Sequence, residues 1–488
     1  MIRPQVLHVL LALFATSLAF AQEKNAAPLT LQECVDRALN KNFDLKIQRF
    51  STQSAHDDVI AADAGYDPSL VLGVGAAGSR NANVSPAQTT QQTSSRLAVT
   101  QQIVTGASVT ASTALDRSRE SPFIAPPLYN PVYNSDVTLS IKQPLLKGAG
   151  ITLNRAAIAR AKLGVTRANF NFKSVVLTVV RNVEGAYYNL AFAREQLAVY
   201  DFSLGVAQKL LDENKARREA GVATDLDVLQ AEVGVANARR SLLLAGQTVH
   251  DSEDSLLRLI GQFEFANTPG TVRLNEDPVP DVSFDHSYAI ALANQPDYAA
   301  NKVLIEQLKV DAFTAKNNRL PSLDLGGAIG YNSKDSDSYG SATGSAFSGD
   351  DYNWQVDLTL SFPWGLRAER ARYRQALSSV NQQESVLRQL DQNILVQVRT
   401  AVRAVETNKE SVNISTLATR LSEKQFAFEK ARYEAGLSTF RFVQQSQAEL
   451  DTARVSELQA RVNLRLSLAD LARLEASSLA SYKITLAE

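Results

Sequence analysis

Two features of the sequence have residue types and spacing that could support binding or catalysis. They are the glycine-rich segment 73–78 and the single cysteine, Cys34. Segment 73–78 has the glycine spacing of a dinucleotide-binding loop, but such a loop requires a helix directly after it. The residues that follow are polar and lead to Pro86, which indicates a loop instead. One cysteine excludes a disulfide scaffold and a cysteine-ligated metal cluster. The four histidines lie far apart in the sequence and form no metal-ligand motif.

A calcium-binding loop is another candidate. Asp335 and Asp337 begin such a loop, but its fifth position is Tyr339 and its twelfth is Ala346 instead of a glutamate. The sequence also contains no phosphate-binding P-loop, serine-hydrolase elbow or zinc-protease motif. We therefore predict no catalytic site, no metal and no cofactor. The balance of 50 basic against 51 acidic residues argues against a nucleic-acid partner, which a basic excess would attract.

Two copies of one sequence unit determine the expected architecture. Residues 215–230 align without gaps on residues 430–445, with nine of sixteen positions identical, where chance would give about one. Each copy runs from a helical segment through alternating strands to a proline-free helical stretch of about 70 residues, which would be about 105 Å long. Gly221 and Gly436 each follow such a stretch and predict a tight turn.

The segment between two prolines of each copy changes to the two-residue period of a β-strand. In residues 354–362, Val356 and Leu358 alternate with Asp357. This alternation fits a membrane barrel wall, apolar toward lipid and polar toward the lumen, and equally a half-buried soluble sheet. The secretory signal, the strand length and the aromatic residues at both strand ends favour the barrel. The predicted membrane-interface aromatics are Trp354, Phe362 and Trp364.

The sequence divides into five parts. Residues 1–21 have the positive start, apolar run and small-residue cleavage site of a secretory signal peptide, with a short membrane anchor as the alternative. The full division is signal peptide 1–21, first repeat 22–262 with strands at about 69–144 and its tip at 221, linker 263–281, second repeat 282–475 with strands at about 322–362 and its tip at 436, and C-terminal tail 476–488.

These features together resemble the TolC family of outer-membrane efflux proteins. The resemblance covers essentially the whole mature chain and rests on the duplicated helix–glycine–helix turn, on residues 432–439, and on residues 143–146 after a strand. It implies that the chain is an α+β membrane protein that forms a homotrimer. Its transmembrane β-barrel, with four to six strands per chain, would be closed by trimerisation and continuous with a long periplasmic α-helical barrel. The family has four strands per chain, and this chain offers six candidates, including a hairpin with arms at 96–104 and 107–115. Either the barrel is larger or this hairpin lies outside it, and we favour the second.

The resemblance also implies a function and a location. The protein would lie in the cell outer membrane, in contact with lipid, and would extend into the periplasm. It would conduct substrates passively after docking on a periplasmic adaptor protein, and through that adaptor it would serve an inner-membrane pump for efflux or type I secretion. A periplasmic adaptor-like coiled-coil protein without a barrel is the alternative function. A secreted enzyme lacks support, because no catalytic constellation is present.

The two tips are the predicted adaptor contact, although they can also be plain helix turns. Six and nine residues after the second tip glycine, where the family often carries acidic rings, this sequence has Phe442 and Gln445. The first copy has Asp227 and Gln230 at those places. We expect Phe442 to form an apolar entrance constriction that resists wetting, with packing between helices as the alternative. The predicted tip residues are Ala220, Gly221, Val222, Ala435, Gly436 and Leu437.

Overall fold

The computed structural model describes residues 29–83, 85–122, 130–261, 272, 274, 278–333, 336–348 and 351–485. The predicted signal peptide 1–21 lies outside the described residues, as do most of the predicted linker 263–281 and Asp335 of the calcium-like loop. The chain divides into two compact units. We call Met1–Gln48, Lys173–Gln295 and Gln392–Glu488 the helical unit, and Arg49–Phe172 with Pro296–Asp391 the sheet unit.

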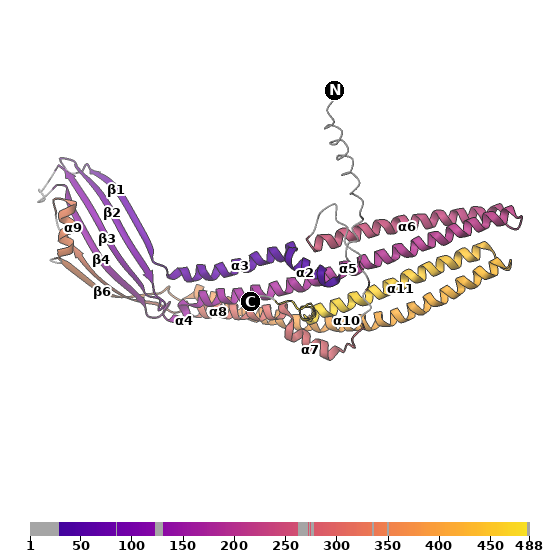
Figure 1. Cartoon of the computed structure of the whole chain (residues 1–488). Coiled ribbons are helices and arrows are strands. Elements are labelled where there is room, and N and C mark those ends of the chain that lie inside the picture. The colour runs from indigo at the N-terminus through magenta and orange to yellow at the C-terminus, as the bar shows by residue number, and fades with distance from the viewer. Residues whose placement is uncertain are drawn as a thin grey trace, which may run out of the picture. The chain divides into compact units, whose positions relative to one another are not determined.

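The helical unit contains five helices of its own among its described residues: α2 (Leu31–Lys41), α6 (Asp225–Leu259), α7 (Phe284–Asn294), α11 (Phe440–Glu475) and α12 (Ser478–Ser481). Three further helices have residues in both units: α3 (Phe43–Asp63), α5 (Ala156–Glu219) and α10 (Arg367–Glu434). Within the helical unit, α5, α6, α10 and α11 run alongside one another (Figure 1).

The length of α5 and α10 follows from their sequences. They contain 64 and 68 residues, whereas globular helices average about 10 to 14. No proline, which would break a helix, occurs in residues 148–220 or 365–435. In α5, Val176, Val183 and Leu190 recur every seven residues and are completely buried, so one face of the helix is stabilised by packing. Within the described residues, no helix is both long enough and apolar enough to cross a membrane.

Among its described residues, the sheet unit contains one antiparallel sheet whose six strands lie side by side in chain order (Figure 1). The strands are β1 (Ser69–Asn81), β2 (Gln88–Gln102), β3 (Ser108–Ser121), β4 (Val132–Pro144), β5 (Ser322–Asn332) and β6 (Tyr352–Ser361). The glycine-rich segment 73–78 lies inside β1, where it is not followed by a helix. The unit also contains the 3-10 helix η1 (Ala64–Tyr66), α4 (Ile151–Asn154), α8 (Pro296–Asn317) and α9 (Tyr339–Ser348).

The two faces of the sheet differ in polarity, as the alternation predicted. Along β6, the side chains of Val356, Leu358 and Leu360 share one face and are 58–67 % exposed. Asp357 and Thr359 lie on the opposite face, and the Thr359 hydroxyl donates to Asp357 Oδ2 (3.2 Å). The sheet therefore has one apolar face and one polar face.

The hairpin that we preferred to place outside the barrel forms two inner strands of this sheet, β2 and β3. β2 and β3 are inner strands, because β1 pairs with β2 from Ser69 to Asn81 and β3 pairs with β4 from Ser108 to Ser118. Backbone hydrogen bonds on both sides hold the hairpin in the sheet. The arms are also longer than predicted, because residues 88–95 are Ser, Thr and Gln without an apolar alternation and still form a regular ladder.

The serine-, glycine- and aspartate-rich composition of segment 332–351 predicts a long surface loop between two strands. The structure instead has a helix, α9, within this segment. Ala342 and Ala346 are almost completely buried, and their small side chains allow α9 to lie close to β4. The Ser135 hydroxyl donates to the Ala342 carbonyl oxygen (3.3 Å). Tyr339 packs edge-on against Tyr133, with ring centroids 4.5 Å apart. The loop prediction failed because glycine, serine and threonine have low helix propensity, and burial against β4 overrides it here.

Candidate functional site at the helix tips

The turn between α5 and α6 is built around Gly221. Its φ is +81°, a left-handed conformation that glycine adopts without a steric penalty. The N–H of Gly221 donates to the Arg218 carbonyl oxygen (2.9 Å), and the N–H of Val222 donates to the Arg217 carbonyl oxygen (2.9 Å). These two bonds form a Schellman motif, which satisfies carbonyls at the helix end and stops α5 there.

The turn between α10 and α11 repeats this geometry. Gly436 has a φ of +74°. Its N–H donates to the Tyr433 carbonyl oxygen (3.0 Å), and the N–H of Leu437 donates to the Arg432 carbonyl oxygen (2.8 Å). The sequence identity between segments 215–230 and 430–445 thus corresponds to one local structure formed twice.

Both turns present an apolar side chain to solvent. Val222 is 74 % exposed and Leu437 is 72 % exposed. In many Schellman motifs, an apolar residue in the last helical turn packs against the side chain that follows the turn glycine. Here the residues at that helical position are Arg217 and Arg432. All six residues predicted for the tips are exposed: Ala220, Gly221, Val222, Ala435, Gly436 and Leu437.

The two helices that follow the turns begin differently. In α6, Thr224 and Asp227 form a capping box, in which the Thr224 N–H donates to Asp227 Oδ2 (2.9 Å) and the Asp227 N–H donates to Thr224 Oγ1 (3.2 Å). In α11, the cap residue Thr439 makes no such side-chain bond, and Phe442 stands where the capping acid would be. The Asp227 carboxylate is therefore engaged at the start of α6, and Gln230 is half-buried.

Tyr433 joins the ends of α5 and α10. Its hydroxyl donates to Asn214 Oδ1 (2.6 Å), and Asn214 is completely buried. The Arg217 guanidinium lies 4.4 Å from the centroid of the Tyr433 ring and donates to the Tyr433 carbonyl oxygen (3.3 Å). One apolar cluster therefore supports both tips. Its buried members are Leu210, Leu211, Val228, Ala231, Val235, Tyr433, Phe440 and Val443.

Phe442 points away from this cluster. Its side chain is 54 % exposed, whereas Phe440 and Val443 are 3 % and 0 % exposed. Gln445 is also exposed, and its amide donates to Glu449 Oε1 (2.9 Å). Phe442, Gln445 and Glu449 are three and four residues apart, so they share one face of α11. The sequence analysis missed Glu449, which the helical spacing from Phe442 could have identified.

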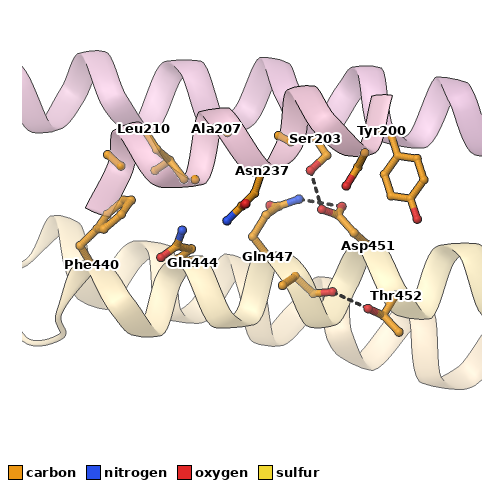
Figure 2. A pocket seen from close by; sticks show the side chains of 15 residues that line it. Tyr200, Ser203, Ala207, Leu210, Asn237, Phe440, Gln444, Gln447, Asp451 and Thr452 are labelled. Atoms are coloured by element: carbon orange, nitrogen blue, oxygen red, sulfur yellow. Dashed lines mark hydrogen bonds between the residues drawn. The ribbon is translucent and has the colours of Figure 1, made fainter. Parts of the chain in front are cut away.

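A cavity of about 340 Å³ lies between α5, α6 and α11, beside the apolar cluster (Figure 2). In Figure 2, Ser203 and Gln447 point toward Asp451. The Ser203 hydroxyl and the Gln447 amide (2.9 Å) both donate to the Asp451 carboxylate. Burial raises the pKa of Asp451, and the two hydrogen bonds oppose that rise. The sequence analysis missed Asp451 and its two partners. The residue of the first copy that corresponds to Asp451 is Ala236, so comparison of the two copies does not single out this position.

The predicted interface aromatics gather at β6 and the residues after it. Trp354 is 71 % exposed on the apolar face, and Trp364 is 94 % exposed beyond the end of the strand. Phe362 and Trp364 stack with ring centroids 6.3 Å apart. No metal centre accompanies these features: in the described ranges, no three His, Cys, Asp or Glu side chains are grouped closely enough to hold a metal ion.

Sequence comparison supplies an independent observation. The sequence model of the family described as "Outer membrane efflux protein" matches residues 34–262 and 288–476. The pyoverdine export outer membrane protein OpmQ of Pseudomonas aeruginosa is 27 % identical over 336 residues, which cover 66 % of this chain and 64 % of that protein. The chain therefore spans a little less than two thirds of the length of that relative.

Solved structures share the fold at lower identity. The outer-membrane channel OprN matches with a TM-score of 0.69 and 16 % identity, covering 91 % of this chain and 89 % of that chain. The CmeC outer membrane channel of Campylobacter jejuni matches with a TM-score of 0.67 and 16 % identity, covering 96 % and 95 %. The predicted α+β fold, in which long helices follow an antiparallel sheet along the chain, is confirmed.

Proposed function

This chain belongs to the outer membrane efflux protein family, and we propose that it is the exit duct of a tripartite efflux or type I secretion system. It resides in the outer membrane and extends into the periplasm. In the proposed role it conducts cargo passively from the periplasm to the exterior and catalyses no reaction.

The observation that carries this proposal is the exposed apolar face of the sheet. Val356, Leu358 and Leu360 on β6 are more than half exposed, and the same face continues on the other strands. Soluble monomers rarely leave an apolar area of this size in contact with water. Contact with lipid accounts for the apolar face, and a water-filled lumen accounts for the polar face. A periplasmic adaptor would have no use for either.

The proposed duct is a homotrimer, as in other members of the family. A membrane barrel needs at least eight strands to close, and the described part of one chain supplies six. Copies of the chain must therefore complete the wall. The division into two repeats, 22–262 and 282–475, is part of this proposal and is supported by the shared geometry of the turns at Gly221 and Gly436.

The proposed partner at the tips is a periplasmic adaptor protein, which would link the duct to an inner-membrane pump. Val222 and Leu437 support this assignment, because each is an exposed apolar side chain on a rigid turn. Apolar anchors of this kind provide much of the binding energy of protein interfaces once a partner covers them.

We propose that Phe442 narrows the periplasmic entrance. Its side chain is exposed and takes no part in capping α11, and Gln445 and Glu449 continue the same face. Three copies of Phe442 facing a common axis would form an apolar ring that resists wetting. Asp227 and Gln230 of the first copy would contribute less to this constriction, because the Asp227 carboxylate is held in the capping box.

The cargo is also a matter of proposal. Because the relative OpmQ is described as a pyoverdine export protein, we place pyoverdine first among the compounds to test. Its export from a strain that lacks this chain should fall and should recover when the chain is restored. Unchanged export would remove pyoverdine from the candidates and leave the duct itself unaffected.

Site-specific photo-crosslinking in cells tests the docking role. A photoreactive residue at Val222 or at Leu437 should capture one periplasmic adaptor, identified by mass spectrometry. The control position is Leu243 in α6, which is 75 % exposed and therefore matched in exposure but away from the turns. Capture of the adaptor at Leu243 alone, or at neither tip in protein assembled in the outer membrane, would contradict the docking role.

A further inference from the structure

The edge strands of the sheet each have one hydrogen-bonded neighbour. β1 pairs with β2 and β6 pairs with β5, and in the described sheet neither has a strand on its other side. All 13 residues of β1 and all 10 residues of β6 are exposed in the single chain. An open edge of this length is a template for another strand, and barrels remove such edges by closing on themselves.

The hairpin of β2 and β3 continues the apolar face without interruption. Successive ladder partners form one row that crosses all six strands and whose members are all exposed. This row is Leu70, Val99, Ala111, Leu139, Ile329 and Trp354. A lipid-facing wall requires apolar side chains at one level on every strand. Val99 and Ala111 meet that requirement for the hairpin.

The opposite face is just as continuous and is suited to water. The row one residue further along is Val71, Ala98, Ser112, Thr138, Gly330 and Asn353. Apart from Val71, its members are small or polar. A neighbouring row places Arg96 and Asp136 on either side of Ala114, so charged side chains also lie on this face. The hairpin therefore follows the inward and outward pattern of the other four strands.

We propose that all six strands of each chain belong to the membrane barrel, and that β6 of one copy pairs with β1 of the next, so that three copies close a barrel of 3 × 6 = 18 strands. This inference rests on the proposed trimeric duct. Since the strands alternate in direction from β1 to β6, β6 and the β1 of a second copy meet as an antiparallel pair. The closed wall has an even number of strands, as bacterial barrels have.

The register of this junction follows from the two strand ends. β1 begins at Ser69, and β6 ends at Ser361. Placing these ends side by side brings Gly73 opposite Asp357 and keeps the apolar face on one side of the wall. A slip by one residue would turn that face toward the lumen, so slips by two residues are the nearest alternatives.

The strand number determines the width of the duct. Strands about 4.8 Å apart and tilted by about 40° each contribute about 6.3 Å to the circumference. Eighteen strands then form a backbone cylinder about 36 Å across, compared with about 24 Å for the twelve strands implied by the family resemblance. The barrel of this chain would admit bulkier cargo than a twelve-stranded one.

Disulfide formation between copies tests the junction. The double variant Gly73→Cys with Asp357→Cys, isolated from outer membranes, should oxidise to a covalent trimer that reductant dissolves. A Cβ at Gly73 meets no atom within 4 Å, so the substitution is tolerated. Double variants of Gly73→Cys with Gln355→Cys or Thr359→Cys cover a register slip of two residues. The single variants are the matched controls and should stay unlinked, because the native Cys34 is buried and burial raises its pKa to about 12.

A second pair of cysteine substitutions tests whether the β2–β3 hairpin is part of the barrel wall. If β2 and β3 left the sheet, β1 would lie beside β4 of the same chain, as β5 lies beside β6 in the second copy, where Gly326 is opposite Asp357. The corresponding residues of the first copy are Gly73 and Thr138. Gly73→Cys would then link to Thr138→Cys within one chain. In the six-stranded arrangement this link should not form. A water-soluble thiol reagent should also label Ala98→Cys on the polar face and leave Val99→Cys, on the lipid face, unlabelled.

Each outcome supports or overturns the inference. A trimer that links through residues 73 and 357, or one of their neighbours, together with alternating labelling at 98 and 99, supports eighteen strands. An intrachain link between 73 and 138, or equal labelling at 98 and 99, overturns the inference for a protein that still forms a trimer in the outer membrane. A chain that never reaches the outer membrane as a trimer would instead contradict the proposed function.

Discussion

Phe442 occupies in the second copy the position that Asp227 holds in the first, and the two side chains act differently. Asp227 accepts two hydrogen bonds from Thr224 and begins a helix. Phe442 has no such role and remains 54 % exposed. Aligned positions of a duplicated chain can thus keep one backbone structure while one copy becomes free for another purpose.

Replacing Phe442 tests the apolar constriction. We expect Phe442→Ala to raise the conductance of the purified protein in a planar bilayer, because a smaller side chain lets water and ions enter the narrowest section. Phe428→Ala is the matched control, since Phe428 is 63 % exposed on α10. Unchanged conductance in Phe442→Ala, or an equal rise in both variants, would remove Phe442 from the gate.

Glu184 is a buried residue whose carboxyl group is hydrogen-bonded by one hydroxyl. It is 7 % exposed, its Oε1 accepts a hydrogen bond from the Tyr482 hydroxyl (2.6 Å), and its Oε2 has no hydrogen-bond partner among the described residues. Burial raises the pKa of Glu184 above its ordinary value, while the Tyr482 bond and the charge of Arg181 lower it. The folded protein therefore loses stability as the pH rises past that ordinary value and the carboxyl group ionises.

Removal of that hydroxyl should have a pH-dependent cost. Tyr482→Phe should destabilise the helical unit by about 1–3 kcal/mol at alkaline pH, where the ionised carboxylate loses its donor. The loss should shrink at acidic pH, where Glu184 is protonated in both proteins. Thermal unfolding followed by circular dichroism at the two pH values measures this. In a Glu184→Gln background the pH dependence should vanish, and its persistence would show that another group is responsible.

At the scale of elements, the duplicated turns are alike and the helix starts are not. Thr224→Ala should remove the cap of α6, at a cost of about 1 kcal/mol. Hydrogen exchange of the first turn of α6 should therefore be about fivefold faster. Thr439→Ala is the matched control, because the Thr439 side chain makes no capping bond. If Thr224→Ala accelerated hydrogen exchange in α6 only as much as Thr439→Ala accelerated it in α11, the capping box would contribute nothing.

The polarity of the sheet faces makes a prediction for adjacent residues of β4. Leu139 is 51 % exposed on the apolar face, and the Ser140 hydroxyl, on the other face, donates to the Thr110 carbonyl oxygen (3.4 Å). Leu139→Arg should cost about 2–4 kcal/mol near the middle of the bilayer and reduce the amount of trimer in the outer membrane. Ser140→Arg should assemble nearly normally. The opposite order would mean that the faces are assigned the wrong way round.

The sequence predicted the strands where one face is consistently apolar, and failed where it is not. β6 alternates Val356 and Leu358 with Asp357, so its period was readable. The first half of β2 carries Ser, Thr and Gln on both faces, and its pairing with β1 and β3 is a non-local property. α9 was missed for the same reason, because contact with Ser135 on β4, and not local propensity, stabilises it.

The tips show the same division within the site. Gly221 and Gly436 were predictable, since a positive φ after a helix requires glycine or a close substitute. The bonds that tie Tyr433 to Asn214 and Asp451 to Ser203 join residues more than 200 positions apart, and no local pattern reveals them.

At the scale of the whole molecule, the chain is incomplete in two respects. Within the described residues, its sheet has two open edges, and the apolar side chains of Val356, Leu358 and Leu360 are exposed on one face. Neither feature is stable in water for an isolated monomer. Copies of the chain and surrounding lipid supply both missing contacts in the proposed duct. A small-molecule site with catalytic groups would leave both features unexplained.

An image of the assembled particle tests the central claim most directly. Electron cryo-microscopy of the protein extracted from outer membranes should show three copies around one axis. A closed β-barrel should continue into a helical tunnel with an open lumen along the axis. A monomer stable in plain buffer, or a solid helical bundle without a lumen, would contradict the account.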